Sequence, residues 1–161
     1  MPWQKTHDPY RRWLAEIMLQ QTQVTAVIPY FQKFVERFPT VEHLASASED
    51  EVMANWAGLG YYSRARNLHA CAKAVVEKFS GRFPLELNKL LELPGIGRST
   101  AGAIISAVTD KPVPMLDGNV KRVFARFFKI NEVYGTAGFE KVLWDLTENN
   151  LPQEELSLIH I

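Results

Sequence analysis

The chain has 161 residues, 47% of them hydrophobic, which is enough for one domain with a substantial core. Its 18 Lys and Arg residues balance 18 Asp and Glu residues, so a broadly cationic, nonspecific polyanion-binding surface is excluded. The single cysteine, Cys71, excludes an internal disulfide and a multi-cysteine metal site within these residues, and no stretch is apolar and long enough for a membrane span or signal core.

The first predicted helix starts at Asp8, an N-cap acid followed by a proline, and covers residues 10–20. Glu16 lies between the inward-facing apolar pairs of this helix, so we expect it at the edge of the apolar stripe, where a carboxylate is usually solvated. The polar residues 20–23 then form either a plain loop or a joint that hydrogen-bonds to an external group. The inward-facing positions are Trp13, Leu14, Ile17 and Met18.

Three helices are predicted over residues 24–38, 41–45 and 49–57, the last one started by a capping box at Ser48. Gly58 and Gly60 end it, and the loop that follows carries two tyrosines directly before two arginines. Aromatic rings beside positive charge suit unpaired or distorted nucleic acid. The alternative is a pair of core tyrosines next to a solvated basic face.

A glycine hairpin, residues 93–97, separates a short predicted helix over 86–91 from another over 98–108, after a helix over 67–79. Two glycines make a tight turn, which exposes the backbone N–H groups that begin the second helix of the pair. Such a helix start attracts anions such as phosphate. The hairpin is therefore either a clamp for a nucleic-acid backbone or an ordinary glycine-rich connection.

Beyond the hairpin, prolines predict an extended connection over 111–114, and Asp117 is placed as the N-cap of a helix with the densest positive charge of the chain. A last helix is predicted over 139–148, and residues 153–161 begin a further helical pattern that stops at once. With at least eight helical segments and no convincing strand, the sequence predicts an all-α fold with one core.

Four stretches occur in this order along the chain: WLAEIMLQQTQV (13–24), GLGYY (58–62), LPGIG (93–97) and LDGNVKR (116–122). Together they resemble the MutY-type adenine DNA glycosylases of the helix-hairpin-helix superfamily, which includes endonuclease III. The resemblance runs from Trp3 to about residue 150. It implies a single glycosylase domain over 1–161, mainly the six-helix barrel module, with the hairpin motif at about 86–108. It also implies base excision repair of adenine mispaired with 8-oxoguanine or guanine.

The resemblance assigns the general acid to Glu16 and the second catalytic carboxylate to Asp117. Cleavage of the N-glycosidic bond needs a proton on adenine N7 while positive charge develops on the sugar, so one carboxyl must be protonated and the other ionised. We therefore expect a raised pKa for Glu16, in an apolar pocket beside Trp13 and Leu19, and a charged Asp117 near C1′ of the sugar.

The resemblance also implies binding residues. Those expected to wedge into the duplex and contact 8-oxoguanine are Gln21, Thr22, Leu59 and Tyr61. Those expected to line the adenine pocket are Trp3, Gln4 and Leu19. The DNA phosphate would be held by the amides of Gly95 and Gly97 together with Lys121, and Asn119 would support Asp117. Carbonyls around Leu91, Leu93 and Ile96 are expected to bind a monovalent cation.

Ser99 stands where the lyase branch of the superfamily has a Schiff-base lysine, so the resemblance implies a monofunctional enzyme that uses water and leaves an abasic site. Ser99 is also one of the residues expected to bind DNA. The partner is double-stranded DNA with A:8-oxoguanine or A:G mispairs, with no membrane contact. We expect a monomer that is cytoplasmic and nucleoid-associated in a bacterium, or nuclear in a eukaryote.

Relatives carry a 4Fe-4S cluster and a C-terminal 8-oxoguanine-reading domain, and the chain contains neither the four cluster cysteines nor that domain. We therefore expect no cofactor in this chain, no metal site, and a truncated product. The alternative function is a non-catalytic helix-hairpin-helix remnant that binds DNA in a salt-dependent manner and excises nothing.

Overall fold

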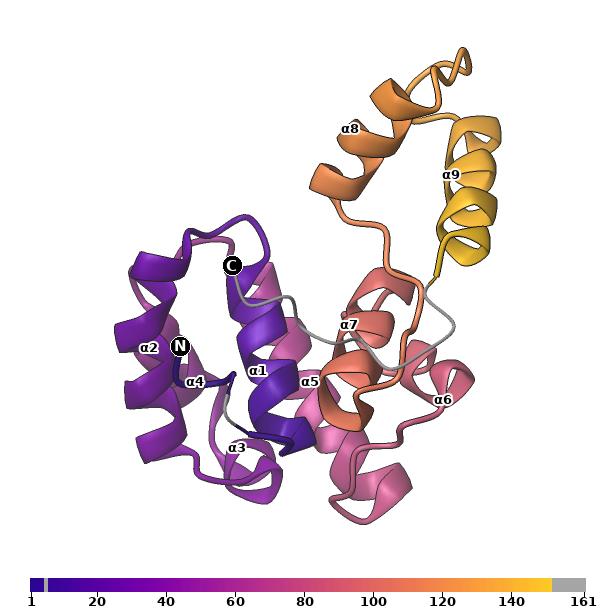
Figure 1. The fold of residues 1–161 in the computed structure, drawn as a ribbon. Helices are drawn as coiled ribbons and strands as arrows, with labels where there is room; N and C mark the ends of the chain where they lie inside the picture. The colour runs from indigo at the N-terminus through magenta and orange to yellow at the C-terminus, as the bar shows by residue number, and fades with distance from the viewer. Residues whose placement is uncertain (5, 152–161) are drawn as a thin grey trace.

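The computed structural model describes residues 1–4 and 6–151, which form nine helices and no strand, so the all-α prediction is confirmed (Figure 1). The helices are α1 (Pro9–Leu19), α2 (Val24–Arg37), α3 (Val41–Ser46), α4 (Glu49–Trp56), α5 (Ser63–Phe79), α6 (Leu87–Leu91), α7 (Arg98–Thr109), α8 (Gly118–Phe127) and α9 (Ala137–Asn149). None of these helices is long and apolar enough to cross a membrane. The helical pattern expected over 153–161 lies outside the described residues.

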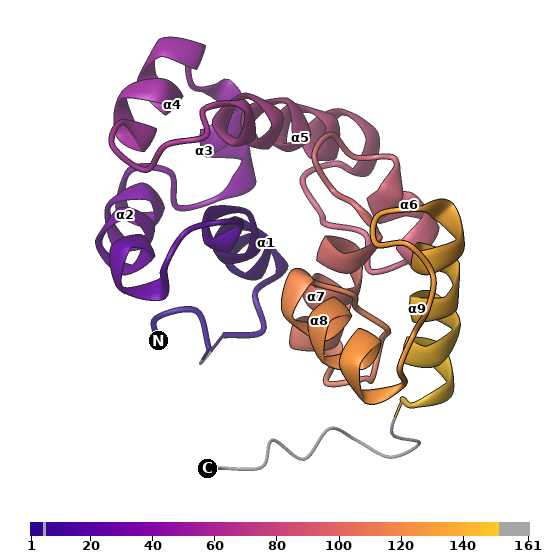
Figure 2. The same cartoon turned by 90° about the horizontal axis from the view of Figure 1, so that it is seen from above.

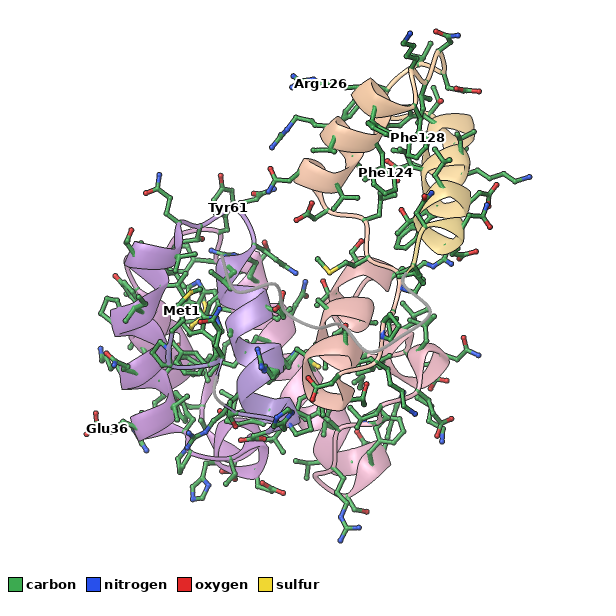
Figure 3. The ribbon with its side chains drawn as sticks, viewed as in Figure 1. Met1, Glu36, Tyr61, Phe124, Arg126 and Phe128 are labelled. Carbon is green, nitrogen blue, oxygen red and sulfur yellow. The ribbon has the colours of Figure 1, made fainter. Side chains whose placement is uncertain are left out.

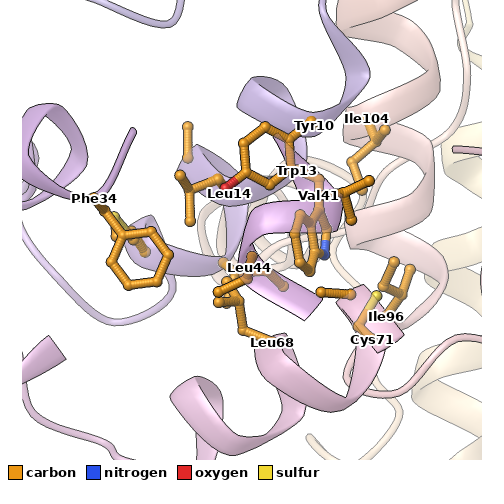
Figure 4. Close-up of a cluster of buried hydrophobic side chains, with 14 of the residues drawn as sticks. Tyr10, Trp13, Leu14, Phe34, Val41, Leu44, Leu68, Cys71, Ile96 and Ile104 are labelled. Carbon is orange, nitrogen blue, oxygen red and sulfur yellow. The ribbon is translucent and has the colours of Figure 1, made fainter. Parts of the chain in front are cut away.

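Helix α1 is central to the main core, where it packs against α2, α5 and α7 (Figure 2). Trp13, Leu14 and Met18 are fully buried along α1, and Ile17 nearly so, as its apolar spacing predicts. Figure 4 shows Trp13 and Leu14 among side chains of the same cluster, including Phe34 of α2 and Leu68 of α5. The residues beside Glu16 are thus fixed by dense packing.

A second, smaller cluster holds α8 against α9, and the connection of residues 110–117 joins it to α7. Its buried members are Leu116, Phe139 and Leu143. Figure 1 shows the ribbons of α8 and α9 beyond the end of α7, and Arg98 of α7 forms an ion pair with Glu148 of α9. The described residues therefore form two hydrophobic clusters of unequal size.

Capping side chains begin the helices at the predicted places. Asp8 accepts a hydrogen bond from the Tyr10 amide (3.0 Å), and Ser48 accepts one from the Glu51 amide (3.2 Å). Helix α5, however, begins at Ser63, four residues before the expected start. Left-handed backbone at Gly60 (φ +75°) and Tyr61 (φ +49°) reverses the chain early, so both arginines of this stretch lie in the first turn of α5.

Candidate active site

Glu16 and Asp117, 101 positions apart in the sequence, interact electrostatically. Glu16 is half-buried on α1, at the edge of its apolar stripe as predicted. Burial is the largest cause that raises the pKa of Glu16; the negative charge of Asp117 raises it further, while Arg12 opposes the shift. The net upward direction agrees with the expectation for a carboxyl that is to donate a proton.

Asp117 lies at the N-terminus of α8, which it caps. Its Oδ1 accepts hydrogen bonds from the amides of Asn119 and Val120, both at 2.8 Å. Negative charge is favourable at this end of a helix. Oδ2 has no hydrogen-bond partner among the described residues, so one oxygen of an oriented carboxylate is left for other interactions.

Two residues of α7 hold the segment that leads to Asp117. The Ser99 hydroxyl donates to the Leu116 carbonyl (2.8 Å) and accepts from the Leu116 amide (3.1 Å). A Cβ at Gly102 would lie 2.5 Å from the Pro114 carbonyl oxygen, so the connection passes directly over this glycine. Ser99 thus contacts the backbone of the residue before Asp117, a role that its sequence position did not reveal.

The N-terminal segment is attached to α1 by Arg12, a residue for which the sequence indicated no role. Its Nε donates to the Thr6 carbonyl (2.8 Å) and its Nη2 to the Gln4 carbonyl (3.0 Å). The guanidinium therefore orients the segment with the expected adenine-pocket residues and also acts on Glu16, one helical turn away.

The three expected adenine-pocket residues differ in exposure. Trp3 is 4% exposed and packs edge-on against Phe31, with ring centroids 5.1 Å apart. Leu19 is half-buried and Gln4 is exposed. Trp13, expected beside Glu16, is fully buried and lies near Phe83, with 4.9 Å between ring centroids.

The hairpin between α6 and α7 has the expected tight turn. Gly95 has φ +77°, Leu93 and Ile96 are buried on either side of it, and the Ile96 amide donates to the Leu93 carbonyl (3.2 Å). Leu91, the third residue of the expected cation site, is 41% exposed. The amides of Gly95 and Gly97 donate no hydrogen bond to another described residue, so both are available to an anion.

The two hairpin glycines make different demands on the fold, which predicts different effects of alanine. A Cβ at Gly95 would lie 2.9 Å from Cβ of Asn67 on α5, whereas a Cβ at Gly97 would meet no atom within 4 Å. Gly95→Ala should lower the free energy of unfolding by about 1–3 kcal/mol, because it adds this clash to a left-handed backbone. Gly97→Ala, at an N-cap with φ −91°, should cost less than about 1 kcal/mol. Urea unfolding followed by circular dichroism measures both, and equal losses would contradict the prediction.

The loops with the expected wedge residues expose only some of them. Tyr61 is 59% exposed and Gln21 is exposed, whereas Leu59 is only 7% exposed and Thr22 is half-buried. Figure 3 shows Tyr61 at the upper end of the lobe that contains α1, pointing away from its core. In this structure Gln21 and Tyr61 are therefore the members of the set that project into solvent.

The alternative of two core tyrosines next to a solvated basic face is wrong, whereas the nucleic-acid interpretation stays a prediction in which Arg66, and not Arg64, is the exposed arginine. Tyr61 and Tyr62 are exposed, so they are not core residues, and Arg64 is 8% exposed, so it is not part of a solvated or DNA-facing basic surface. The Arg64 guanidinium instead donates to main-chain carbonyls of both loops. No sequence pattern signals this, because the acceptors are backbone groups that every residue carries.

The cationic side chains near Asp117 already have partners. Lys121 donates to Glu140 of α9 (2.5 Å), and Asn119 accepts from Arg122 through its side-chain oxygen. Asn119 thus contacts Asp117 through its backbone amide and not through its side chain. A phosphate contact by Lys121 would have to compete with Glu140.

Cys71 is the only cysteine of the chain and is buried in α5, where burial raises the pKa of its thiol to about 12. The residues of this chain therefore do not fit a four-cysteine iron-sulfur cluster. The described residues also contain no group of three or more His, Cys, Asp or Glu side chains that could hold a metal ion.

A family model described as "HhH-GPD superfamily base excision DNA repair protein" matches residues 14–149. The chain is 47% identical over 152 residues to an adenine DNA glycosylase of Buchnera aphidicola subsp. Baizongia pistaciae, covering 94% of this chain and 43% of that protein. It is 41% identical to the human adenine DNA glycosylase over 157 residues, covering 92% of this chain and 29% of that protein. The chain thus spans less than half the length of these relatives.

Solved structures share the fold. A thermostable thymine-DNA glycosylase superposes with a TM-score of 0.82 at 30% identity, covering 92% of this chain and 69% of that one. A trapped endonuclease III–DNA covalent intermediate superposes with a TM-score of 0.75 at 23% identity, covering 87% of this chain and 70% of that one. The predicted helix-hairpin-helix glycosylase architecture is confirmed by these neighbours.

Proposed function

The chain belongs to the HhH-GPD superfamily of base excision DNA repair proteins, and on that premise we propose that it hydrolyses the N-glycosidic bond of adenine mispaired with 8-oxoguanine or guanine in duplex DNA. The observation that carries the proposal is a half-buried Glu16 whose pKa is raised by burial and further by the negative charge of Asp117, because this chemistry needs one protonated and one ionised carboxyl group. Relatives named adenine DNA glycosylase, 41–47% identical over most of this chain, support adenine as the base.

The two carboxyl groups have separate roles in the proposed mechanism. Glu16 donates its proton to N7 of the extruded adenine, which makes the base a better leaving group. Asp117 stays charged and stabilises the positive sugar as the bond breaks. Water then attacks C1′ and gives up a proton to the now ionised Glu16, and an abasic site remains, because Ser99 cannot form a Schiff base with the sugar.

DNA binding is proposed to use the free hairpin amides of Gly95 and Gly97 for a phosphate of the damaged strand. Gln21 and Tyr61 enter the duplex opposite the extruded adenine, with Leu59 and Thr22 behind them. Trp3, Gln4 and Leu19 contact the base. The protein acts as a monomer on chromosomal DNA, in the nucleoid of a bacterium or the nucleus of a eukaryote.

A single-turnover assay on a duplex with one adenine opposite 8-oxoguanine tests the function. We expect adenine release, measured by chromatography, and strand cleavage only after alkali, with no release from a duplex whose adenines all face thymine. Because the chain spans less than half of its relatives, a second candidate is a non-catalytic DNA-binding module. Retained duplex binding without adenine release would favour that module.

The pH dependence of adenine release should change when the positive charge of Arg12 is removed. Arg12 lowers the pKa of Glu16, so Arg12→Met should raise that pKa. The general acid works only when protonated, and the rate falls as pH rises through its pKa, so the alkaline limb of the rate–pH profile should move to higher pH. Single-turnover rates from pH 5 to 9 measure the shift. Arg11→Met is the matched control, since Arg11 pairs with Asp8; an unmoved limb in the Arg12 variant would contradict the prediction.

A further inference from the structure

Arg64 is a buried cation without a carboxylate partner. It lies in the first turn of α5, is 8% exposed, and has no Asp or Glu oxygen within 4.0 Å among the described residues. Burying a charge is costly unless polar groups compensate it. Because no carboxylate compensates the charge of Arg64, the dipoles of the surrounding oxygen atoms must compensate it.

The two terminal nitrogens of Arg64 bind different segments. Nη1 donates to the carbonyls at the end of α1 and beyond it, at 3.0 Å from Ile17, 2.9 Å from Met18 and 2.6 Å from Gln20. These carbonyls carry the negative end of the α1 dipole.

Nη2 connects that segment with the loop before α5. It donates to the Thr22 hydroxyl (3.1 Å) and to the carbonyls of Leu59 (3.4 Å) and Gly60 (3.2 Å). A single planar fork therefore joins residues 20–22 to residues 58–61, two loops that are nearly forty positions apart and have no backbone hydrogen bond to each other among the described residues.

Both loops also carry a residue in an unfavourable backbone conformation. Gln21 has φ +56° and lies between Gln20 and Thr22, both held by Arg64; Tyr61 has φ +49° and follows Gly60, also held by Arg64. Left-handed backbone at residues other than glycine persists only where the surroundings impose it. The guanidinium further lies 5.3 Å from the Trp56 ring centroid and 5.4 Å from that of Tyr61.

We propose that Arg64 is a positioning residue that fixes loops 20–22 and 58–61 as one rigid unit, and that this unit drives the extrusion of the target base. The inference rests on the proposed function. Extrusion costs free energy through lost stacking and pairing, and side chains offset this cost best when they are already held in place. Arg64 therefore acts before the chemical step and touches neither substrate nor the reacting atoms.

Arg64→Lys is the main test variant, because it keeps the positive charge and removes the fork that reaches both loops. Lys78→Met, an exposed cation in the last turn of α5, is the control. Val75→Ala, in the core face of α5, controls for lost stability and is compared at temperatures equally far below each unfolding midpoint.

The first readout is amide hydrogen exchange in the free protein. We expect faster exchange in peptides covering residues 19–24 and 57–62 together in Arg64→Lys, and unchanged exchange at the hairpin over 93–97. Faster exchange in only one loop, or in neither, would overturn the inference. This readout does not depend on any enzymatic activity.

The second readout compares adenine paired opposite 8-oxoguanine with the same adenine opposite an abasic site, where no partner base has to be left behind. Arg64→Lys should lower the single-turnover rate about tenfold on the first duplex and less than about threefold on the second, with an unchanged pH profile. Equal losses on both duplexes, as expected from Val75→Ala, would overturn the inference.

A duplex with 2-aminopurine at the target position distinguishes failure of the proposed function from failure of this inference. The fluorescence of 2-aminopurine rises when the base leaves the stack. If the wild-type chain brightens this probe but releases no adenine, the glycosylase proposal is wrong, and the ratio of brightening between wild type and Arg64→Lys decides this inference instead. If the wild-type chain leaves 2-aminopurine stacked, the inference about Arg64 is overturned.

Discussion

Glu16→Gln is expected to lower the single-turnover rate of adenine release by about 10²- to 10⁴-fold, the usual contribution of a general acid. The amide has nearly the same shape as the carboxyl but cannot transfer a proton to N7. Burial and Asp117 raise the pKa of Glu16 against the opposing effect of Arg12, so at a given pH a larger fraction of this group is protonated than of an exposed carboxyl. Release of adenine from an A:8-oxoguanine duplex measures the loss.

Glu36→Gln is the matched control, since Glu36 is an exposed carboxylate on α2 (Figure 3). It should leave the rate unchanged. Duplex affinity, measured by fluorescence anisotropy, should be preserved in both variants, because neither carboxyl is needed for phosphate contacts. Adenine release by the Glu16 variant at the wild-type rate would assign the general acid to another group.

Asp117→Asn is expected to lower the same rate by about 10²- to 10³-fold, as loss of one preorganised electrostatic group does. Asparagine is as good an N-cap as aspartate, and its side-chain oxygen can still accept from the amides of Asn119 and Val120. The variant therefore removes the charge and keeps the helix start. The unfolding midpoint should change little.

The same variant should also move the alkaline limb of the pH profile. The negative charge of Asp117 raises the pKa of Glu16, so its removal should lower that pKa and shift the limb to lower pH, opposite to the shift expected for Arg12→Met. Asp145→Asn, an exposed carboxylate on α9, is the control. Unshifted profiles in both Asp117 and Arg12 variants would show that Glu16 is not the titrating acid.

The parts of the fold that were predictable from sequence depend on local interactions. Asp8 with Pro9 and Ser48 with Glu51 begin helices because each cap needs only the next few residues. The inward positions of α1 follow from its helical period in the same way. The motif order placed Glu16 and Asp117 in one site only through the family resemblance, since no local rule brings together residues of two distant helices.

The contributions of Arg64, Arg12 and Ser99 could not be predicted for the opposite reason. Each of them bonds to backbone groups, which lie in distant segments for Arg64 and Ser99 and in the preceding N-terminal segment for Arg12, and backbone acceptors leave no trace in the sequence. From the sequence alone, Arg64 looks like a DNA-facing cation beside two tyrosines. Its burial could not be predicted, because it depends on contacts with α1, more than forty positions earlier. Long-range polar contacts of this kind require the structure.

The two carboxyl groups of the proposed mechanism belong to different hydrophobic clusters. Glu16 belongs to the large cluster through α1, whereas Asp117 starts a helix whose cluster has three buried members among the described residues. Regions with few buried apolar contacts open at a lower free energy than the main core of a protein. Warming the chain should therefore release Asp117, the residue proposed to stabilise the positive sugar, while Glu16 is still held in an intact core. Catalysis would then end at a temperature where most of the helical circular dichroism signal remains.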